Sequence, residues 1–217
     1  DKMVKIEEKV MKNKEFELPP HTYSFRQNKT NLWEETALKF LRDKYDLSKK
    51  EIIEADLHYC VHGKYKNCII IPCYFRNKLV SFIGRVWYKN TKKRYINCSN
   101  EEGLVNTKNL LYNYDNIQKN QNLIITEGVF DCIKVKSVFK NVVATFGTEI
   151  SQEQINLLVG LKPKKLIVLT DNDPGNPNTV KKAQKICDYL SPFMDTKMIE
   201  VPFFGEDPAD LTREEIY

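Results

Sequence analysis

The pattern of apolar and polar residues changes character twice along the chain. After a charged, irregular stretch over residues 1–30, apolar residues at helical spacing predict two short helices between residues 31 and 57. Asn31 and Ser48 stand where these helices would begin, and a glutamate follows each of them in the capping-box position. Residues 1–30 are therefore interpreted as a tail or linker that leads into the fold.

The second pattern is strand-like. Three runs rich in β-forming residues are separated by short polar turns, at residues 67–75, 79–88 and 94–98. Runs of this kind with tight turns between them favour an antiparallel meander. Residues 99–120, which follow, are polar and less regular.

From residue 121 onward, strands and helices alternate. Short apolar strands are expected at 123–126, 142–145, 166–170 and 197–201, with helices between them at 129–139, 151–159 and 178–190. Most of these strands are continuously apolar, which is typical of a parallel sheet covered on both faces. The predicted fold class is α+β, with a mixed helical and antiparallel β subdomain over residues 31–120. An α/β domain with a largely parallel sheet follows over residues 121–217.

Composition bounds the possible functions. Of the 217 residues, 41% are hydrophobic and 29% charged, so the chain can bury a core and wholesale disorder is excluded. The formal net charge of +5 permits a nucleic-acid partner without demonstrating one.

The longest apolar run, residues 68–75, is far shorter than the roughly 20 residues of a membrane span. Residues 1–5 lack the apolar core of a signal peptide, so we expect a cytoplasmic protein without a membrane partner.

The six cysteines include no Cys-x-x-Cys pair, and reduced thiols are expected. The densest group is His58, Cys60 and His62, followed by Cys68 and Cys73. A zinc site is conceivable there, but the spacing matches known ligand patterns poorly. Thiols that pack as small apolar groups on a strand are the favoured interpretation.

Acidic residues follow three of the four strands expected after residue 121. Glu127 follows the first strand, Asp171 and Asp173 follow the third, and Asp207 comes shortly after the fourth. Open α/β sheets bind ligands at the carboxyl ends of their strands, and converging carboxylates need cations such as Mg²⁺. Each of these short acidic motifs, taken alone, would also be typical of a turn or of the start of a helix. Their order and shared placement favour a metal–phosphate site.

Residues 62–120 interleave cations with aromatic residues, as in Lys64-Tyr65-Lys66 and Arg85-Val86-Trp87-Tyr88-Lys89. Cations that hold phosphates beside aromatic faces that stack on bases would suit a single-stranded nucleic acid. A solvated basic surface with inward-pointing aromatic residues would give the same pattern. The pattern alone leaves both interpretations open.

Two sets of motifs resemble a known family. In order and spacing, Glu127-Gly-Val-Phe-Asp131, Phe146-Gly-Thr148, Asp171-Asn-Asp173 and Asp207-Pro208 resemble the TOPRIM domain. The upstream half is similar to the basic subdomain of DnaG-type bacterial and phage primases, at Ile69-Ile-Ile-Pro72, Gly84-Arg85, Arg94-Tyr-Ile-Asn97-Cys-Ser99, Lys108 and Leu111-Tyr112. The resemblance covers about residues 16–212. It implies an RNA polymerase core that makes short RNA primers on single-stranded DNA.

The resemblance also implies roles for individual acids. Glu127 would be the general base or a metal-binding carboxylate, and Asp171 and Asp173 would hold Mg²⁺, for which Mn²⁺ can substitute. Asp207 would be an accessory acid of the metal site, and Asp131 would support the site structurally. No zinc is expected in this fragment. Asp210 is separated from Asp207-Pro208 by Ala209, where many members have Asp directly, so its role stays open.

The implied cationic residues are Arg85, Arg94 and Lys108, which would position the template or the incoming ribonucleoside triphosphate. Many members have Lys where Arg94 stands, which keeps the charge and alters the geometry. A zinc-binding domain and a fused or separate replicative helicase would be partners in a full-length protein of a bacterium or phage. Because the chain opens on Asp1, we expect an excised catalytic core.

Three alternatives remain at this stage. A TOPRIM nuclease would cut DNA with the same metals. A non-catalytic module would use the basic half to hold single strands. A topoisomerase fragment would need a catalytic tyrosine in domains that this sequence does not contain.

Overall fold

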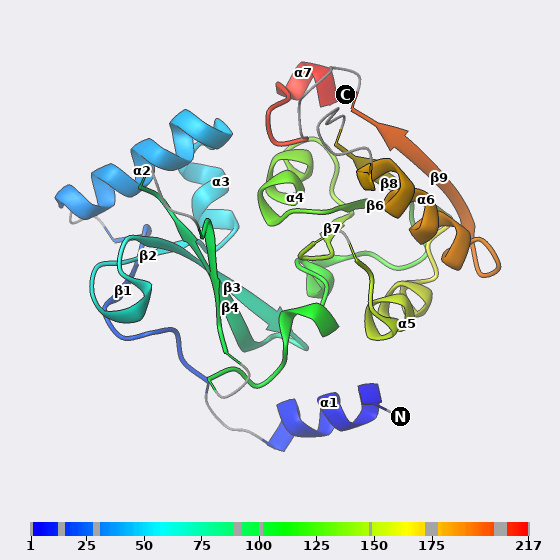
Figure 1. Ribbon diagram of the computed structural model, residues 1–217, viewed down its shortest axis with the longest axis horizontal. Helices are drawn as coiled ribbons and strands as arrows, with labels where there is room; N and C mark the ends of the chain where they lie inside the picture. Colours follow the sequence, from blue (N-terminus) through cyan, green and yellow to red (C-terminus); the bar gives the residue numbers. More distant parts are fainter. Residues whose placement is uncertain are drawn as a thin grey trace. The chain divides into compact units, whose positions relative to one another are not determined.

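The computed structural model describes residues 2–12, 16–27, 31–88, 93–99, 102–147, 149–171, 178–201 and 208–216. The chain folds into two compact units, Asp1–Thr107 and Lys108–Tyr217. Figure 1 traces the elements of both. Residues 108–120 group with the second unit, whereas the sequence suggested that they belong with the basic half. The division into a basic subdomain that ends at residue 120 and a second domain that begins at residue 121 stays a prediction.

The first unit is built on a five-stranded antiparallel sheet in the order β1-β2-β3-β4-β5. Its strands are β1 (Thr22–Ser24), β2 (His58–Cys60), β3 (Cys68–Phe75), β4 (Lys78–Val86) and β5 (Tyr95–Asn97). β3 and β4 form a long hairpin whose turn residues Arg76 and Asn77 have φ of 55° and 58°. Two left-handed turn residues match the right-handed twist of a hairpin. The predicted meander is therefore confirmed.

Helices α2 (Leu32–Tyr45) and α3 (Lys49–Glu54) begin where the capping residues predicted. The Asn31 side chain accepts a hydrogen bond from the Glu34 backbone N–H at 2.9 Å. Ser48 and Glu51 form a reciprocal capping box at the start of α3. Local signals are therefore enough to place both helices.

The interpretation of residues 1–30 as irregular is wrong, because this stretch contains helix α1 (Lys2–Lys12) and strand β1. Glu7 pairs with Arg76 of the β3–β4 turn at 2.6 Å, and the Val10 carbonyl accepts a hydrogen bond from Lys78 Nζ. β1 pairs along β2. These contacts join residues far apart in sequence, so local patterning carries no trace of them.

The second unit contains a four-stranded parallel sheet in the order β7-β6-β8-β9. Its strands are β6 (Leu123–Thr126), β7 (Val142–Ala144), β8 (Lys165–Thr170) and β9 (Asp195–Glu200). Its helices are α4 (Val129–Lys136), α5 (Gln152–Leu161), α6 (Asn178–Leu190) and α7 (Arg213–Ile216). The alternation of strands and helices, and their parallel pairing, are confirmed.

Helices α4 and α6 pack on opposite faces of this sheet (Figure 1). Val135 of α4 lines one cavity together with Ile124 and Ile167, whereas Ala183 of α6 lines another together with Val168. Successive strand residues point to opposite faces, so apolar runs such as that of β8 fill both sides. None of the described helices is both long and apolar enough to cross a membrane.

Candidate active site

The predicted carboxylates follow neighbouring strands. β6 and β8 lie side by side, with Ile125 paired to Val168. Glu127 comes directly after the last residue of β6, and Asp171 directly after the last residue of β8. Parallel strands end at the same edge of a sheet, so the structure brings these two acids to one edge. Both residues are partly exposed, as a ligand-binding carboxylate must be.

Gly128 and Asp131 shape the turn that carries Glu127. Asp131 Oδ2 accepts a hydrogen bond from the Gly128 backbone N–H at 2.9 Å, and Asp131 is only 8% exposed. A Cβ at position 128 would lie 2.5 Å from that oxygen, so glycine leaves room for the carboxylate. Asp131 therefore holds the backbone beside Glu127. Its contribution to the reaction stays a prediction.

Phe146 and Gly147, which follow β7, contact the turn that carries Glu127. The Gly147 N–H donates to the Glu127 carbonyl at 3.2 Å, and Thr145 Oγ1 donates to the Gly147 carbonyl at 2.7 Å. Phe146 and Gly147 have φ of 62° and 147°, and such values are costly for a residue like phenylalanine. The ring of Tyr112 packs edge-on against Phe146, at 6.2 Å between ring centroids. Thr148 lies outside the described residues.

A lysine that the sequence did not single out lies at this edge of the sheet. Lys182 of α6 lines a small cavity of about 20 Å³ together with Glu127, Gly147 and Thr179. A cation beside carboxylates lowers their mutual repulsion and suits an anionic ligand. The sequence could have indicated Lys182 only through its position on the helix that follows Asp171 and Asp173.

Two of the four predicted metal-site acids, Asp173 and Asp207, lie outside the described residues. Within the described part of the chain, no group of three His, Cys, Asp or Glu side chains gathers as a metal site. The two placed acids, Glu127 and Asp171, supply oxygen ligands, which hard divalent cations such as Mg²⁺ prefer. The residues present therefore fit such a cation, and the complete set of ligands stays a prediction.

Arg85 and Arg94 lie together in the first unit. Arg85 is only 5% exposed, and its Nε donates to the Tyr45 hydroxyl at 2.9 Å while its Nη1 donates to the Arg94 carbonyl at 3.1 Å. The guanidinium carbon lies 5.6 Å from the centre of the Phe40 ring and 4.9 Å from that of Tyr95. Arg85 is therefore held rigidly by hydrogen bonds and by cation–π contacts.

These two arginines line a half-open cavity of about 640 Å³ between α2 and β4. The cavity has the size of a small-molecule site, for which about 300–1,000 Å³ is usual. Lys108, the third predicted cation, lies in the short 3₁₀ helix Thr107–Asn109 and is exposed. That Arg85, Arg94 and Lys108 bind template or nucleotide stays a prediction.

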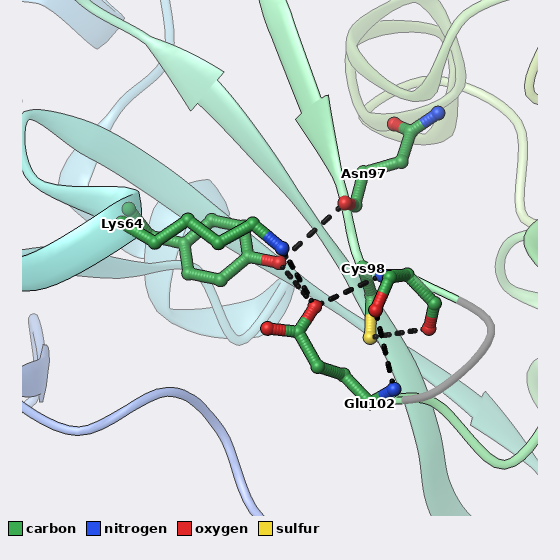
Figure 2. A network of polar contacts seen from close by, with 6 residues as sticks. Lys64, Asn97, Cys98 and Glu102 are labelled. Atoms are coloured by element: carbon green, nitrogen blue, oxygen red, sulfur yellow. Dashed lines mark hydrogen bonds and ion pairs between the residues drawn. The ribbon is translucent and has the colours of Figure 1, made fainter.

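A polar network joins Glu102 to residues of the first unit. Glu102 accepts hydrogen bonds from Lys64 Nζ at 2.9 Å, from the Tyr65 hydroxyl at 2.8 Å and from the Ser99 backbone N–H at 3.0 Å. Figure 2 shows Glu102 beside Lys64 in this network. The hydrogen bonds from Ser99 and Lys64 lower the pKa of Glu102 to about 2. Burial, with the Glu102 hydrogen bond, raises the pKa of Tyr65 to about 12.

Comparison with known proteins supports the two-part architecture. Residues 124–212 match the family model described as Toprim-like. A DNA primase of Clostridium acetobutylicum is 29% identical over 186 residues, covering 82% of this chain and 30% of the relative. A DNA primase of Staphylococcus aureus (strain COL) is 29% identical over 159 residues, covering 70% of this chain and 26% of the relative. The chain thus spans less than a third of the length of these relatives.

Solved structures extend the similarity beyond the Toprim-like region. A DnaG catalytic core matches with a TM-score of 0.68 at 20% identity, covering 85% of this chain and 70% of the other. The Aquifex aeolicus primase, with its zinc-binding and RNA polymerase domains, matches with a TM-score of 0.58 at 25% identity, covering 82% of this chain and 45% of the other. The chain has the fold of a DnaG-type primase core.

The resemblance predicted from the motifs is therefore confirmed, as is the α+β fold class. In this DnaG-type fold, Glu127 and Asp171 fall within the Toprim-like region, and so do the sequence positions of Asp173 and Asp207. Arg85 and Arg94 lie upstream of that region, in the first unit.

Proposed function

We propose that this chain is the catalytic core of a DNA primase, which joins ribonucleotides into short RNA primers on single-stranded DNA. The observation that carries the proposal is the placement of Glu127 and Asp171 after adjacent strands of a Toprim-like sheet. The DnaG-type fold and the DNA primase relatives support the choice of reaction. A Toprim-like region alone would not select it.

Glu127, Asp171 and Asp173, with Asp207 as an accessory acid, are proposed to hold Mg²⁺, and Mn²⁺ would substitute. Such an ion, when bound, supplies charge neutralisation at the triphosphate. In the reaction, a 3′-oxygen forms a bond to the α-phosphorus, the bond to the β-phosphate oxygen breaks, and pyrophosphate leaves. Glu127 is proposed either to take the proton of the 3′-hydroxyl or to bind the ion. Arg85, Arg94 and Lys108 attract and orient template and nucleotide.

The proposed ligands are single-stranded DNA and ribonucleoside triphosphates. Among structures of similar fold, one contains the zinc-binding domain of a primase and another comes from the bacteriophage T7 primase-helicase protein. We propose corresponding partners here, namely a zinc-binding domain and a replicative helicase. The proposed location is the cytoplasm of a bacterium or of a phage-infected host.

The test is a primer-synthesis assay with single-stranded DNA, labelled ribonucleotides and Mg²⁺ or Mn²⁺. A short complementary dinucleotide is supplied so that extension can be seen without de novo initiation. Metal-dependent oligoribonucleotides are expected from the wild type and are expected to disappear in Asp171→Asn. Asp188→Asn, an exposed α6 residue away from the site, is the matched control and should keep activity.

Other outcomes would contradict the proposal. Shortening of the template strand in place of product would indicate a nuclease. Tight DNA binding without product or cleavage, equal in the presence and absence of metal and unaffected by Asp171→Asn, would indicate a non-catalytic binding module.

A further inference from the structure

We propose that β9 is a docking edge for a second copy of this chain, with the two β9 strands paired antiparallel about a two-fold axis at Thr196. β9 is the last strand in the order β7-β6-β8-β9, and Figure 1 shows it at the border of the sheet. Within the described part of the chain, its only strand neighbour is β8. None of the residues that make this edge is assigned to the proposed reaction.

The backbone groups of alternate β9 residues point toward the outer edge of the sheet. The Val201 N–H, directly after β9, donates to the Thr170 carbonyl of β8 at 3.0 Å. Backbone groups alternate in direction along a strand, so Thr196, Met198 and Glu200 direct their N–H and C=O groups away from β8. A row of such groups pairs readily with another extended strand. β9 therefore has the hydrogen-bonding groups of a docking edge.

The side chains of β9 divide between the two faces of the sheet. Thr196 Oγ1 donates to the Cys187 carbonyl of α6 at 3.4 Å, so Thr196 lies on the face that α6 covers. Asp195, Lys197 and Ile199 therefore lie on the opposite face. All three are exposed. This face of β9 presents an acid, a base and an apolar side chain in turn along the border of the sheet.

Charge selects one register for self-pairing. About a two-fold axis perpendicular to the sheet, each face continues into the same face of the second copy, so residues of one face meet. With the axis at Lys197, the two Lys197 side chains meet and repel each other, and with the axis at Met198, Lys197 meets the apolar Ile199. With the axis at Thr196, Asp195 of each copy meets Lys197 of the other. Opposite charges directly across paired strands stabilise a sheet, and like charges destabilise it.

The register at Thr196 also suits the backbone. Thr196 directs its N–H and C=O groups outward, so the two copies of this residue exchange a pair of hydrogen bonds on the axis. Asp195 and Lys197 then form pairs without backbone hydrogen bonds, in which opposed Cα atoms are only about 4.5 Å apart. Asp195 already pairs with Lys165 of β8 at 3.2 Å, on the same face. The acid therefore lies between two lysines, one from each copy.

Exposed apolar side chains lie on both sides of the paired charges. Phe193, two residues before β9, is 62% exposed, and Ile199, near the end of β9, is 37% exposed. Continuing the register brings Phe193 of each copy to the level of Ile199 of the other. Burying these side chains together removes apolar surface from water and so stabilises the contact.

The first test is sedimentation velocity over a wide range of protein concentration. The wild type should shift from monomer to dimer as the concentration rises. Lys197→Asp should raise the dissociation constant by about tenfold or more, because two attractive pairs become two repulsive ones. Lys185→Asp makes the same change at an exposed position on α6 and should leave the association unchanged.

A charge-swapped variant separates loss of pairing from loss of fold. Lys165→Asp/Asp195→Lys/Lys197→Asp reverses all three charges and keeps their attraction within each copy and between copies, so it should dimerise as the wild type does. Charges on an edge strand can also serve to prevent pairing. A wild type that stays monomeric would show that they do so here and would overturn the proposal. A monomeric charge-swapped variant, or equal association of Lys197→Asp and Lys185→Asp, would overturn it as well.

Cysteine cross-linking tests the register. Under mild oxidation, a mixture of Asp195→Cys and Lys197→Cys proteins should form a covalent dimer, because these positions are directly opposed when the axis lies at Thr196. Asp195→Cys mixed with Ile199→Cys should not, since those positions are opposed only when the axis lies at Lys197. Wild-type protein gives the background from its own thiols. Equal cross-linking of the two mixtures, or preference for the second, would overturn the proposed pairing.

Discussion

At the scale of single residues, Gly128 and Asp131 show how a short motif encodes a conformation. The Asp131 carboxylate occupies the space that a side chain at position 128 would need, and it bonds the Gly128 N–H. The glycine at the start of α4 and the acid three positions later therefore act together as one motif. Its consequence is a fixed backbone immediately beside Glu127.

Gly128→Ala should therefore destabilise the fold by about 1–3 kcal/mol, because the new Cβ displaces Asp131 and leaves a buried polar group unpaired. Unfolding in urea measures the change. Gly160→Ala is the matched control, since a Cβ built there in α5 would meet no atom within 4 Å apart from its chain neighbours and the backbone of its own helix. The control should be neutral or stabilising by up to about 1 kcal/mol. An equal response of the two variants would contradict this view of the motif.

Glu102 predicts a pH effect at the residue scale. Its pKa falls from 4.5 to about 2 in the folded chain, through hydrogen bonds from Ser99 and Lys64. A depressed folded pKa contributes stability above the unfolded pKa, and this contribution is lost as pH falls toward the folded value. The stability difference between wild type and Glu102→Gln should be constant above about pH 6 and should shrink from about pH 5 to pH 2. A difference that does not change over this range, in urea unfolding at several pH values, would show that Glu102 is not held in this way.

At the scale of elements, the sequence was informative wherever the signal is local. Asn31 and Ser48 placed the starts of α2 and α3, and the apolar runs after residue 121 placed the parallel strands. Helix α1 was missed because it is held by contacts from Glu7 and Val10 to the β3–β4 hairpin. Lys182 was missed for the same reason, since its significance depends on which residues from other elements lie beside it.

The contacts of α1 give a prediction for that element. Val10 is fully buried and Val4 is exposed on the same helix. Val10→Ala should cost about 1–3 kcal/mol of the local stability of α1, whereas Val4→Ala should have little effect. Hydrogen exchange of the α1 amides measures both, and an equal loss of protection in the two variants would show that α1 does not dock through Val10.

At the scale of the whole molecule, the order of the strands explains the candidate site. The acids at 127 and 171 are far apart in sequence, and they lie at the same edge of the sheet because β6 and β8 are neighbours. The sequence predicted this from strand-end placement and from the family resemblance together. The positions of Asp173 and Asp207 fall outside the described residues, so their place beside Glu127 stays a prediction.

The most direct test of the central claim is whether ribonucleotide incorporation follows the template. On an oligothymidylate template with a complementary dinucleotide and Mg²⁺ or Mn²⁺, the chain should incorporate adenylate and should not incorporate the other ribonucleotides. Glu127→Gln should abolish this incorporation, because it removes the carboxylate charge at the end of β6 while keeping the shape of the side chain. Incorporation that ignores the template, or that persists in Glu127→Gln, would contradict the proposal that this chain is a primase core acting through its Toprim-like carboxylates.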